Sequence, residues 1–223
     1  MIHIGWLIGT SSSSILMFVC FVIFSIINYK KRFQLEYDLR NHFPYELNYD
    51  GKYKDNLFGN ICLTLSMLFS LAFFSLTSGF FVKNAVLIFC LIAGAIYSAI
   101  VFFLPFVNLK RIYIHVVTAV MLSCFAFLTP ASVGLVAFQQ FQMEKFIFCL
   151  VIFIISVIFG LFNFVLIMNP KFSFNIQMKK VKLETGEEKI ERPKIIVIAL
   201  SEWIMMFSIF ITQLLLILVL INL

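Results

Sequence analysis

Charged residues are scarce in this sequence, and their scarcity excludes a water-soluble fold. Only 13% of the 223 residues are charged, and 62% are hydrophobic. A soluble domain is roughly a quarter charged and about half apolar. A soluble core of this size could not bury so much apolar surface, so the solvent must be lipid. The length suits a single integral membrane domain over residues 1–223.

The motifs of common enzyme and metal sites are also missing. There is no phosphate-binding GxxxxGK[ST], no GxGxxG after a strand and no zinc-binding HExxH. His3, His42 and His115 lie too far apart to form one local motif. The five cysteines lie inside apolar runs without a CxxC pair, as is typical of small buried side chains. We therefore expect no catalytic residue, no metal site and no cofactor.

Six apolar segments are each long enough to cross a bilayer, which takes about 20 residues. No basic residue precedes the first segment, so we expect it to remain as a helix and not to be removed as a signal peptide. The predicted fold is an all-α membrane protein, a six-transmembrane-helix bundle. The segments are residues 4–28, 57–80, 84–107, 112–137, 146–168 and 195–221.

Basic residues lie mostly on one side of these spans. Residues 29–56, the turn after the third span and residues 169–194 hold 15 of the 17 Lys and Arg residues, and the opposite loops hold 2. Cytoplasmic loops carry the excess of Lys and Arg. We therefore predict a multi-pass cell-membrane protein with both termini outside and loops 29–56 and 169–194 in the cytoplasm. Topology and anionic lipid explain the net charge of +6, so nucleic acid is not an expected partner.

Both cytoplasmic loops carry patterns of local structure. Phe33 and Tyr37 lie four residues apart, which predicts a short amphipathic helix that continues the first span. In the second loop, hydrophobic residues alternate with polar ones before residues 184–186, whose Glu-Thr-Gly resembles a three-residue hairpin loop with Gly at the left-handed position. We predict a small cytoplasmic β-hairpin in which residues 181–183 pair with residues 189–191.

Four polar residues are expected at similar depth in the cytoplasmic half of the bilayer. Glu202 is the acidic residue inside a span, and an ionised carboxylate is costly there. We expect it to face the bundle interior and to contact His115, where the two could share a proton or bind a cation or a polar headgroup. The alternative is a set of unrelated groups near the interface. The candidate cluster is Asn60, His115, Asn163 and Glu202.

Hydroxyl and small residues are the other unusual features of the spans. Five consecutive hydroxyl side chains in the first span cover more than one helical turn, so they cannot all face the same way. They predict either an outward-opening vestibule or helix packing. Small residues four apart, such as Gly5/Gly9 and Ser156/Gly160, allow close contacts within the bundle or with a partner. The candidate vestibule comprises Thr10, Ser11, Ser12, Ser13 and Ser14.

Three classes of function remain open. A non-catalytic subunit of a membrane assembly is favoured by two structured loops and by the scarcity of buried charge. A component of a small-molecule or ion transporter is favoured by the serine tract, Pro130 and Glu202. An intramembrane enzyme acting on lipid through His115 and Glu202 is the third class, and the missing motifs make an enzyme less favoured.

The sequence also indicates the partners and the source. Besides the lipid bilayer, we expect a partner subunit or a homo-oligomer, because small-residue pairs serve helix contacts of any kind. Lysine outnumbers arginine, and Phe, Ile and Asn are abundant, which is typical of an AT-rich bacterial genome. A polar cavity would support the transporter, a filled core with exposed small residues would support the subunit, and a His115–Glu202 contact open to lipid would support the enzyme.

Overall fold

The described part of the computed structural model contains six long α-helices. All six are long and apolar enough to cross a membrane, so the prediction of six membrane-spanning helices is confirmed in length and composition. The structure describes residues 2–48, 52–81, 84–107, 112–139, 146–168, 179–182, 188–191 and 193–221. The helices are α1 (Ile2–Phe33), α2 (Leu57–Phe81), α3 (Ala85–Phe103), α4 (Ile112–Gln139), α5 (Phe146–Met168) and α6 (Val197–Ile221).

Helix α1 extends beyond the predicted span of residues 4–28 at both ends. In lipid each backbone N–H and C=O must find its partner within the segment, so the apolar chain is helical throughout. The hydroxyl residues do not interrupt it, since Thr10 Oγ1 donates to the Trp6 carbonyl oxygen at 2.9 Å, one turn back. The helix ends at Phe33, because Gln34 adopts a positive φ of 55°. The predicted helical continuation of the first span is therefore present as far as Phe33, but its extension through Tyr37 is wrong.

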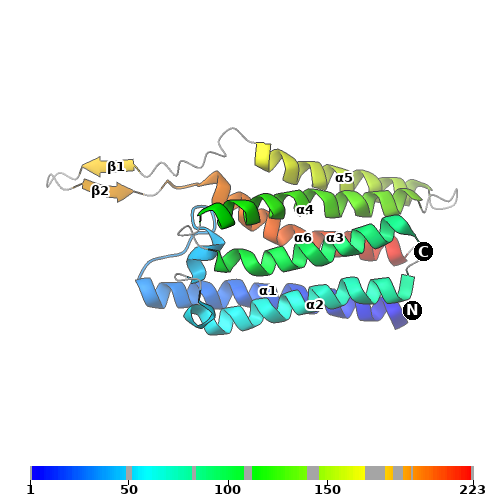
Figure 1. Ribbon diagram of the computed structural model, residues 1–223, viewed down its shortest axis with the longest axis horizontal. Helices are drawn as coiled ribbons and strands as arrows, with labels where there is room; N and C mark the ends of the chain where they lie inside the picture. The colour runs from blue at the N-terminus through cyan, green and yellow to red at the C-terminus, as the bar shows by residue number, and fades with distance from the viewer. Residues whose placement is uncertain are drawn as a thin grey trace.

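Helix α6 lies at the centre of the bundle. It contacts α1, α3, α4 and α5, and it is the most buried of the six spans. Helix α1 pairs with α2, α4 pairs with α5, and α3 contacts both α2 and α4 (Figure 1). Both termini lie at one end of the bundle, and the first loop and the β-strands lie at the other (Figure 1).

Close helix contacts depend on glycine at two interfaces. Gly94 of α3 lies under the ring of Phe74 in α2, where an added Cβ would overlap the ring. An added Cβ on Gly160 of α5 would lie 3.0 Å from the Phe127 carbonyl oxygen of α4, and Gly134 of α4 packs on α5 in the same way. These small residues therefore serve packing within the bundle.

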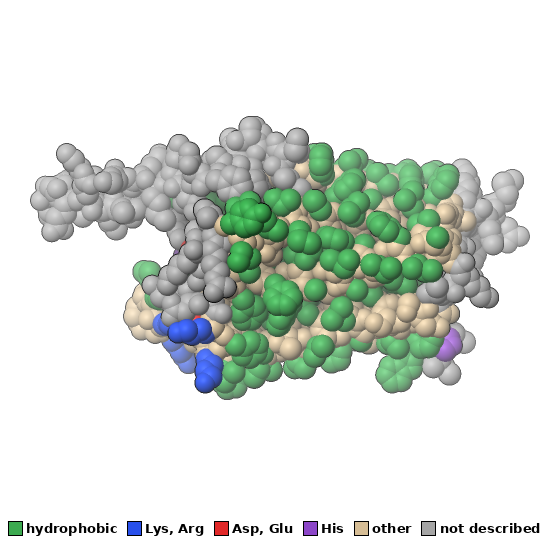
Figure 2. All heavy atoms as spheres, in the orientation of Figure 1, with side chains coloured by type: hydrophobic (Ala, Val, Ile, Leu, Met, Phe, Trp, Pro, Cys, Tyr) green, Lys and Arg blue, Asp and Glu red, His purple; other side chains and the backbone are tan. Residues whose placement is uncertain are grey.

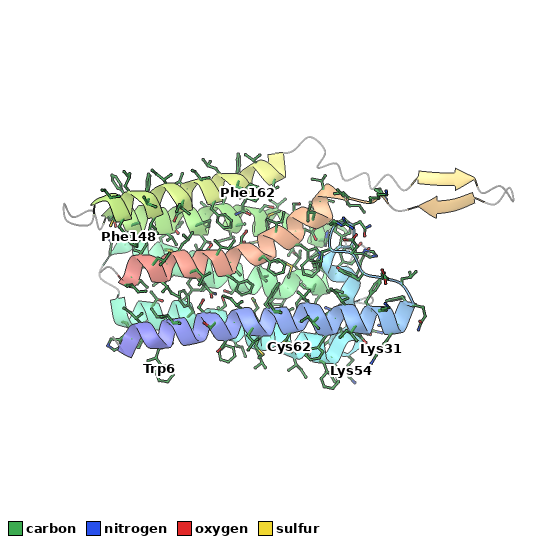
Figure 3. All side chains as sticks on the ribbon, turned by 180° about the vertical axis from the view of Figure 1, so that it is seen from behind. Trp6, Lys31, Lys54, Cys62, Phe148 and Phe162 are labelled. Atoms are coloured by element: carbon green, nitrogen blue, oxygen red, sulfur yellow. The ribbon has the colours of Figure 1, made fainter. Side chains whose placement is uncertain are left out.

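The outer surface is apolar between two ends of different chemistry. Figure 2 shows hydrophobic side chains along the helices and Lys and Arg at the end that carries the first loop. Trp6 and Phe148 lie toward the opposite end, whereas Lys31 and Lys54 lie at the basic end (Figure 3). An apolar belt of this kind requires lipid around it, so the chain is a membrane protein.

The first loop covers the basic end of the bundle through two 3-10 helices, η1 (Pro44–Asn48) and η2 (Tyr53–Asn56). The buried side chains Phe43 and Leu47 anchor it. Leu47 belongs to the main hydrophobic core, and Phe43 packs with residues just before and inside the first turn of α6. The loop is therefore part of the folded bundle and not a separate unit.

Two four-residue strands extend away from the bundle (Figure 1). They are β1 (Lys179–Lys182) and β2 (Glu188–Glu191), and they pair antiparallel with Val181 opposite Lys189. Residues 169–178 and 183–187, which include the predicted turn, lie outside the described residues. The cytoplasmic position of a hairpin in this loop stays a prediction.

Candidate functional site

The two ionisable side chains of the predicted cluster meet inside the bundle. His115 lies in the first turn of α4 and Glu202 in the second turn of α6. Their Nε2 and Oε1 atoms are 3.2 Å apart, and the side chains are 5% and 1% exposed. The predicted contact between Glu202 and a polar side chain of another helix is therefore confirmed.

The position of one proton follows from the histidine's other contact. His115 Nδ1 lies 2.9 Å from the carbonyl oxygen of Val107, which can only accept, so Nδ1 carries a hydrogen. The Nε2–Oε1 contact is short enough to share one further proton, which lies on nitrogen in the ion-pair form and on oxygen in the neutral form. Neither Glu202 oxygen has a well-aligned hydrogen-bond partner among the described residues.

Aromatic rings of the first loop close this site toward water. Phe43 and Tyr45 meet the His115 ring edge-on, at centroid distances of 6.3 and 5.3 Å. Phe43 also packs with Ile196, Ile198 and Ala199 at the start of α6. The His115–Glu202 pair is therefore enclosed between two helices and the loop, and it does not open onto a lipid groove.

Hydrogen bonds fasten the same loop to α6. Trp203 Nε1 donates to the His42 carbonyl oxygen at 3.0 Å, and the Ile196 N–H donates to the Arg40 carbonyl oxygen at 2.9 Å. Tyr37 donates its hydroxyl to the Phe43 carbonyl oxygen at 2.7 Å. These bonds hold the loop in one position over the pair.

Two ionisable groups of the loop are shifted by their surroundings. Burial, followed by the negative charge of Glu46, raises the pKa of Tyr37 well above its ordinary value of 10.0. The Arg40 guanidinium, which hydrogen-bonds both carboxylate oxygens of Asp38, lowers the pKa of Asp38 to about 2. Tyr37 therefore stays neutral and Asp38 stays charged over the physiological range.

Asn60 of α2 serves a different part of the loop. Its Nδ2 donates to Asn48 Oδ1 at 2.8 Å and to the Tyr53 carbonyl oxygen at 2.9 Å. Asn48 in turn donates to the Pro105 carbonyl oxygen at 3.2 Å. Asn60 thus ties the two 3-10 helices of the loop to α2 and to the end of α3.

Asn163 of α5 also lies apart from the pair. Its Oδ1 accepts from Ser208 of α6 at 3.0 Å, and its Nδ2 donates to the Phe159 carbonyl oxygen one turn back. The structure therefore brings His115 and Glu202 of the candidate cluster together, whereas the described bonds of Asn60 and Asn163 run to other residues.

The hydroxyl tract of α1 takes part in helix packing. Ser14 donates to the Ser66 carbonyl oxygen at 2.8 Å, and Ser66 donates back to the Ser14 carbonyl oxygen at 2.7 Å. Ser11 is buried, whereas Ser12 is exposed. The outward-opening vestibule stays a prediction, because the described bonds of this tract run to α1 itself and to α2.

Sequence reasoning missed a second polar contact deep in the bundle. Gln213 of α6 donates to Ser70 of α2 at 2.7 Å, and Ser70 lies 2.7 Å from the hydroxyl of Ser98 in α3. A signal was available, since Gln213 follows Glu202 by eleven residues. That spacing is about three turns and places both side chains on one helical face.

The fold and these contacts identify a broad class of membrane protein and do not indicate a particular family. The chain is a multi-pass α-helical membrane protein, and six helices of its described part are long and apolar enough to cross a bilayer. Within the described residues, no group of three or more His, Cys, Asp or Glu side chains could hold a metal ion. Comparison with known protein families, with curated proteins and with solved structures found no match to this chain.

Proposed function

We propose that this protein is a non-catalytic subunit of a membrane assembly and that a transmembrane helix of its partner docks on the outer half of α1. The observation that carries the proposal is the open surface at Gly5 and Gly9. Both residues are exposed, and an added Cβ at either meets nothing within 4 Å. Small residues four apart on a lipid-facing surface allow another helix to approach closely.

The polar character of the same face supports a protein partner over lipid. Gly5, Gly9, Ser12 and Leu16 lie within about 60° of one another around the helix. Ser12 is exposed, and none of the described hydrogen bonds involves its hydroxyl. Lipid tails cannot accept that bond, whereas a backbone carbonyl of a neighbouring helix can.

Substitution on this face tests the proposal directly. The full chain, purified in mild detergent from its native membrane, should retain a stoichiometric partner that Gly9→Leu removes. Gly79→Leu is the matched control, because Gly79 is exposed on α2 and an added Cβ there also meets nothing within 4 Å. A protein that purifies alone, or a partner lost equally from both variants, would contradict the proposal. A self-dimer broken only by Gly9→Leu would identify a homo-oligomer.

We also propose the orientation in a bacterial cell membrane. The 15-to-2 distribution of Lys and Arg supports cytoplasmic loops at 29–56 and 169–194, with both termini outside. In a cysteine-free background, an impermeant thiol reagent added outside should label a Cys placed at Met143 and not one placed at Thr185. The reverse labelling pattern would overturn this orientation.

The His115–Glu202 pair favours a second candidate, a component of a small-molecule or ion transporter. A buried pair with one shared proton is the chemistry of a proton-coupling site. In proteoliposomes that contain a pH-sensitive dye, wild-type protein should then dissipate a proton gradient and Glu202→Gln should not. The lipid-acting enzyme ranks below both, because the pair is enclosed by Phe43 and Tyr45.

A further inference from the structure

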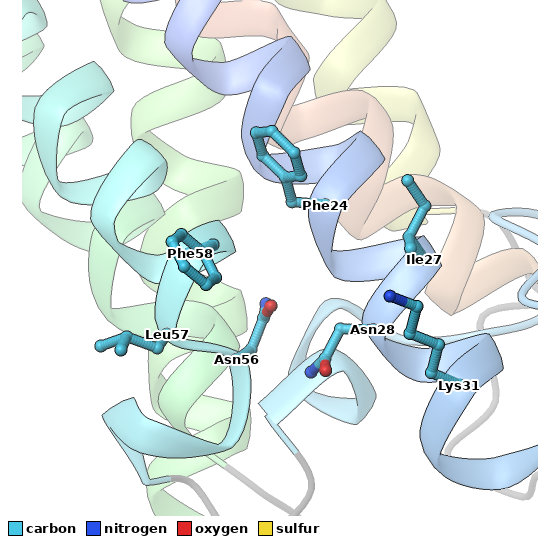
Figure 4. A pocket seen from close by; sticks show the side chains of 7 residues that line it. All are labelled: Phe24, Ile27, Asn28, Lys31, Asn56, Leu57 and Phe58. Atoms are coloured by element: carbon cyan, nitrogen blue, oxygen red, sulfur yellow. The ribbon is translucent and has the colours of Figure 1, made fainter.

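A pocket of about 150 Å³ opens where α1 meets the start of α2, at the basic end of the bundle (Figure 4). Its walls come from the last turns of α1, from the end of η2 and from the first turn of α2. It is separate from the His115–Glu202 pair and from the open glycine face of α1. The side chains that matter to its chemistry are Phe24, Ile27, Asn28, Lys31, Asn56 and Phe58.

One side of the pocket is apolar and open to lipid. Phe24 and Phe58 are 46% and 74% exposed, and their rings lie on either side of the gap between α1 and α2 (Figure 4). Phe24 precedes Lys31 by seven residues, which is about 10 Å along the helix. The apolar wall therefore lies deeper in the membrane than the lysine amine.

The other side carries a positive charge without an acidic partner. Lys30 contacts Glu36 at 3.3 Å, and Arg32 contacts Asp55 at 3.6 Å. Lys31, between them, lines the pocket and has no ion pair among the described residues. Among the described residues, its exposed amine is therefore the cation of this turn of α1 that has no acidic partner.

Two asparagine amides complete the polar side and are held in place. Asn28 Nδ2 donates to the Asp55 carbonyl oxygen at 2.7 Å, and Asn56 Nδ2 donates to Ser25 Oγ at 2.5 Å. One N–H of each amide is therefore used, and no described bond uses either side-chain oxygen. Such oxygens accept hydrogen bonds from hydroxyl groups.

We propose that this pocket binds one anionic phospholipid of the leaflet at the basic end, with its phosphate on Lys31 and an acyl chain along Phe24 and Phe58. A headgroup that carries hydroxyls, such as glycerol, fits the two asparagine oxygens. An anionic lipid can use all three features of the pocket: the unpaired cation, the fixed hydrogen-bond acceptors and the exposed apolar wall. A water-soluble anion would use only the cation. The proposal is independent of the function proposed above.

Native mass spectrometry of the full chain in mild detergent, titrated with phosphatidylglycerol, tests the site. Lys31→Gln should weaken the first bound lipid by about fivefold, the effect of one lysine beside an anionic membrane surface. Lys30→Gln is the control. It also removes one positive charge, but from the neighbouring residue, whose side chain already pairs with Glu36. That variant should stay within about twofold of wild type.

A second pair of variants tests the apolar wall. Phe58→Ala should weaken phosphatidylglycerol binding, whereas Phe103→Ala should not, because Phe103 is a 57% exposed ring at the same end of the bundle but outside the pocket. Equal losses in Lys31→Gln and Lys30→Gln would overturn the proposal, since they would indicate diffuse charge attraction. Equal binding of phosphatidylcholine, or displacement of the lipid by inorganic phosphate, would overturn it as well.

Discussion

Removing His115 should be far more damaging than altering Glu202, because each change leaves a different group behind. His115→Phe leaves a carboxylate that is 1% exposed and has no well-aligned hydrogen-bond partner among the described residues. Breaking a buried ion pair in this way costs about 3–5 kcal/mol in soluble proteins. Unfolded states in a membrane also find polar partners, so we expect a loss of about 2–3 kcal/mol here.

Glu202→Gln should cost much less. His115 Nδ1 donates to the Val107 carbonyl oxygen at 2.9 Å, so Nε2 of the neutral ring is an acceptor. The glutamine amide can donate to that nitrogen without moving either helix. We expect a cost of about 1 kcal/mol, the usual size of one exchanged hydrogen bond. The double variant His115→Phe with Glu202→Leu should recover most of the stability, because apolar replacement of both partners is often neutral.

The measurement is unfolding of the purified protein in mixed micelles with increasing SDS. Trp203 adjoins Glu202 and donates to the His42 carbonyl oxygen, so its fluorescence reports on this region. A Trp6→Phe background removes the other tryptophan, which is 62% exposed. The reasoning fails if His115→Phe is no more destabilising than Glu202→Gln. It also fails if the double variant is as unstable as His115→Phe alone.

Three further outcomes are expected. Gly160→Leu should destabilise the bundle by about 1–3 kcal/mol through overpacking, and Gly79→Leu by less than about 0.5 kcal/mol, in the same SDS assay. Ser70→Ala should cost about 1 kcal/mol, because the Gln213 amide loses its acceptor; no loss there would show that water replaces the hydroxyl. The raised pKa of Tyr37 contributes stability that is complete below pH 10.0 and is lost as the pH rises toward the folded-state pKa. Ultraviolet titration should therefore show a late phenolate that is absent from Tyr37→Phe.

Span number and the His115–Glu202 contact could be predicted because each follows from a large energy. Lipid accepts only segments whose backbone bonds are internal, so long apolar runs become helices with little ambiguity. A carboxylate inside a span is costly unless it is neutral or paired, and the same end of the bundle offers His115 at similar depth. Both arguments need only distance along the chain. Neither requires the rotation of a helix about its axis.

The partners of Asn60 could not be predicted, because they come from the first loop. Asn48 reaches Asn60 only after the chain leaves α1 at Gln34 and folds back as η1. The four-residue spacing of Phe33 and Tyr37 predicts continued helix, but the positive φ of Gln34 ends the helix instead. The cost of that conformation is small, of order 1 kcal/mol. The spacing of two side chains cannot show whether the chain accepts that cost or continues the helix.

The polar residues of α6 nevertheless indicate which of its faces turn toward neighbouring helices. At 3.6 residues per turn, Glu202 and Gln213 fall on one face of α6, and Ser201, Ser208 and Thr212 fall on a second face about 100° away. A helix at the edge of a bundle needs one polar or small face, whereas a central helix meets neighbours on several sides. The first face of α6 reaches His115 of α4 and the Ser70–Ser98 contact, and the second reaches α5 through Ser208. Two polar faces in an otherwise apolar span therefore indicate a central helix, even where hydrophobicity is uniform around it.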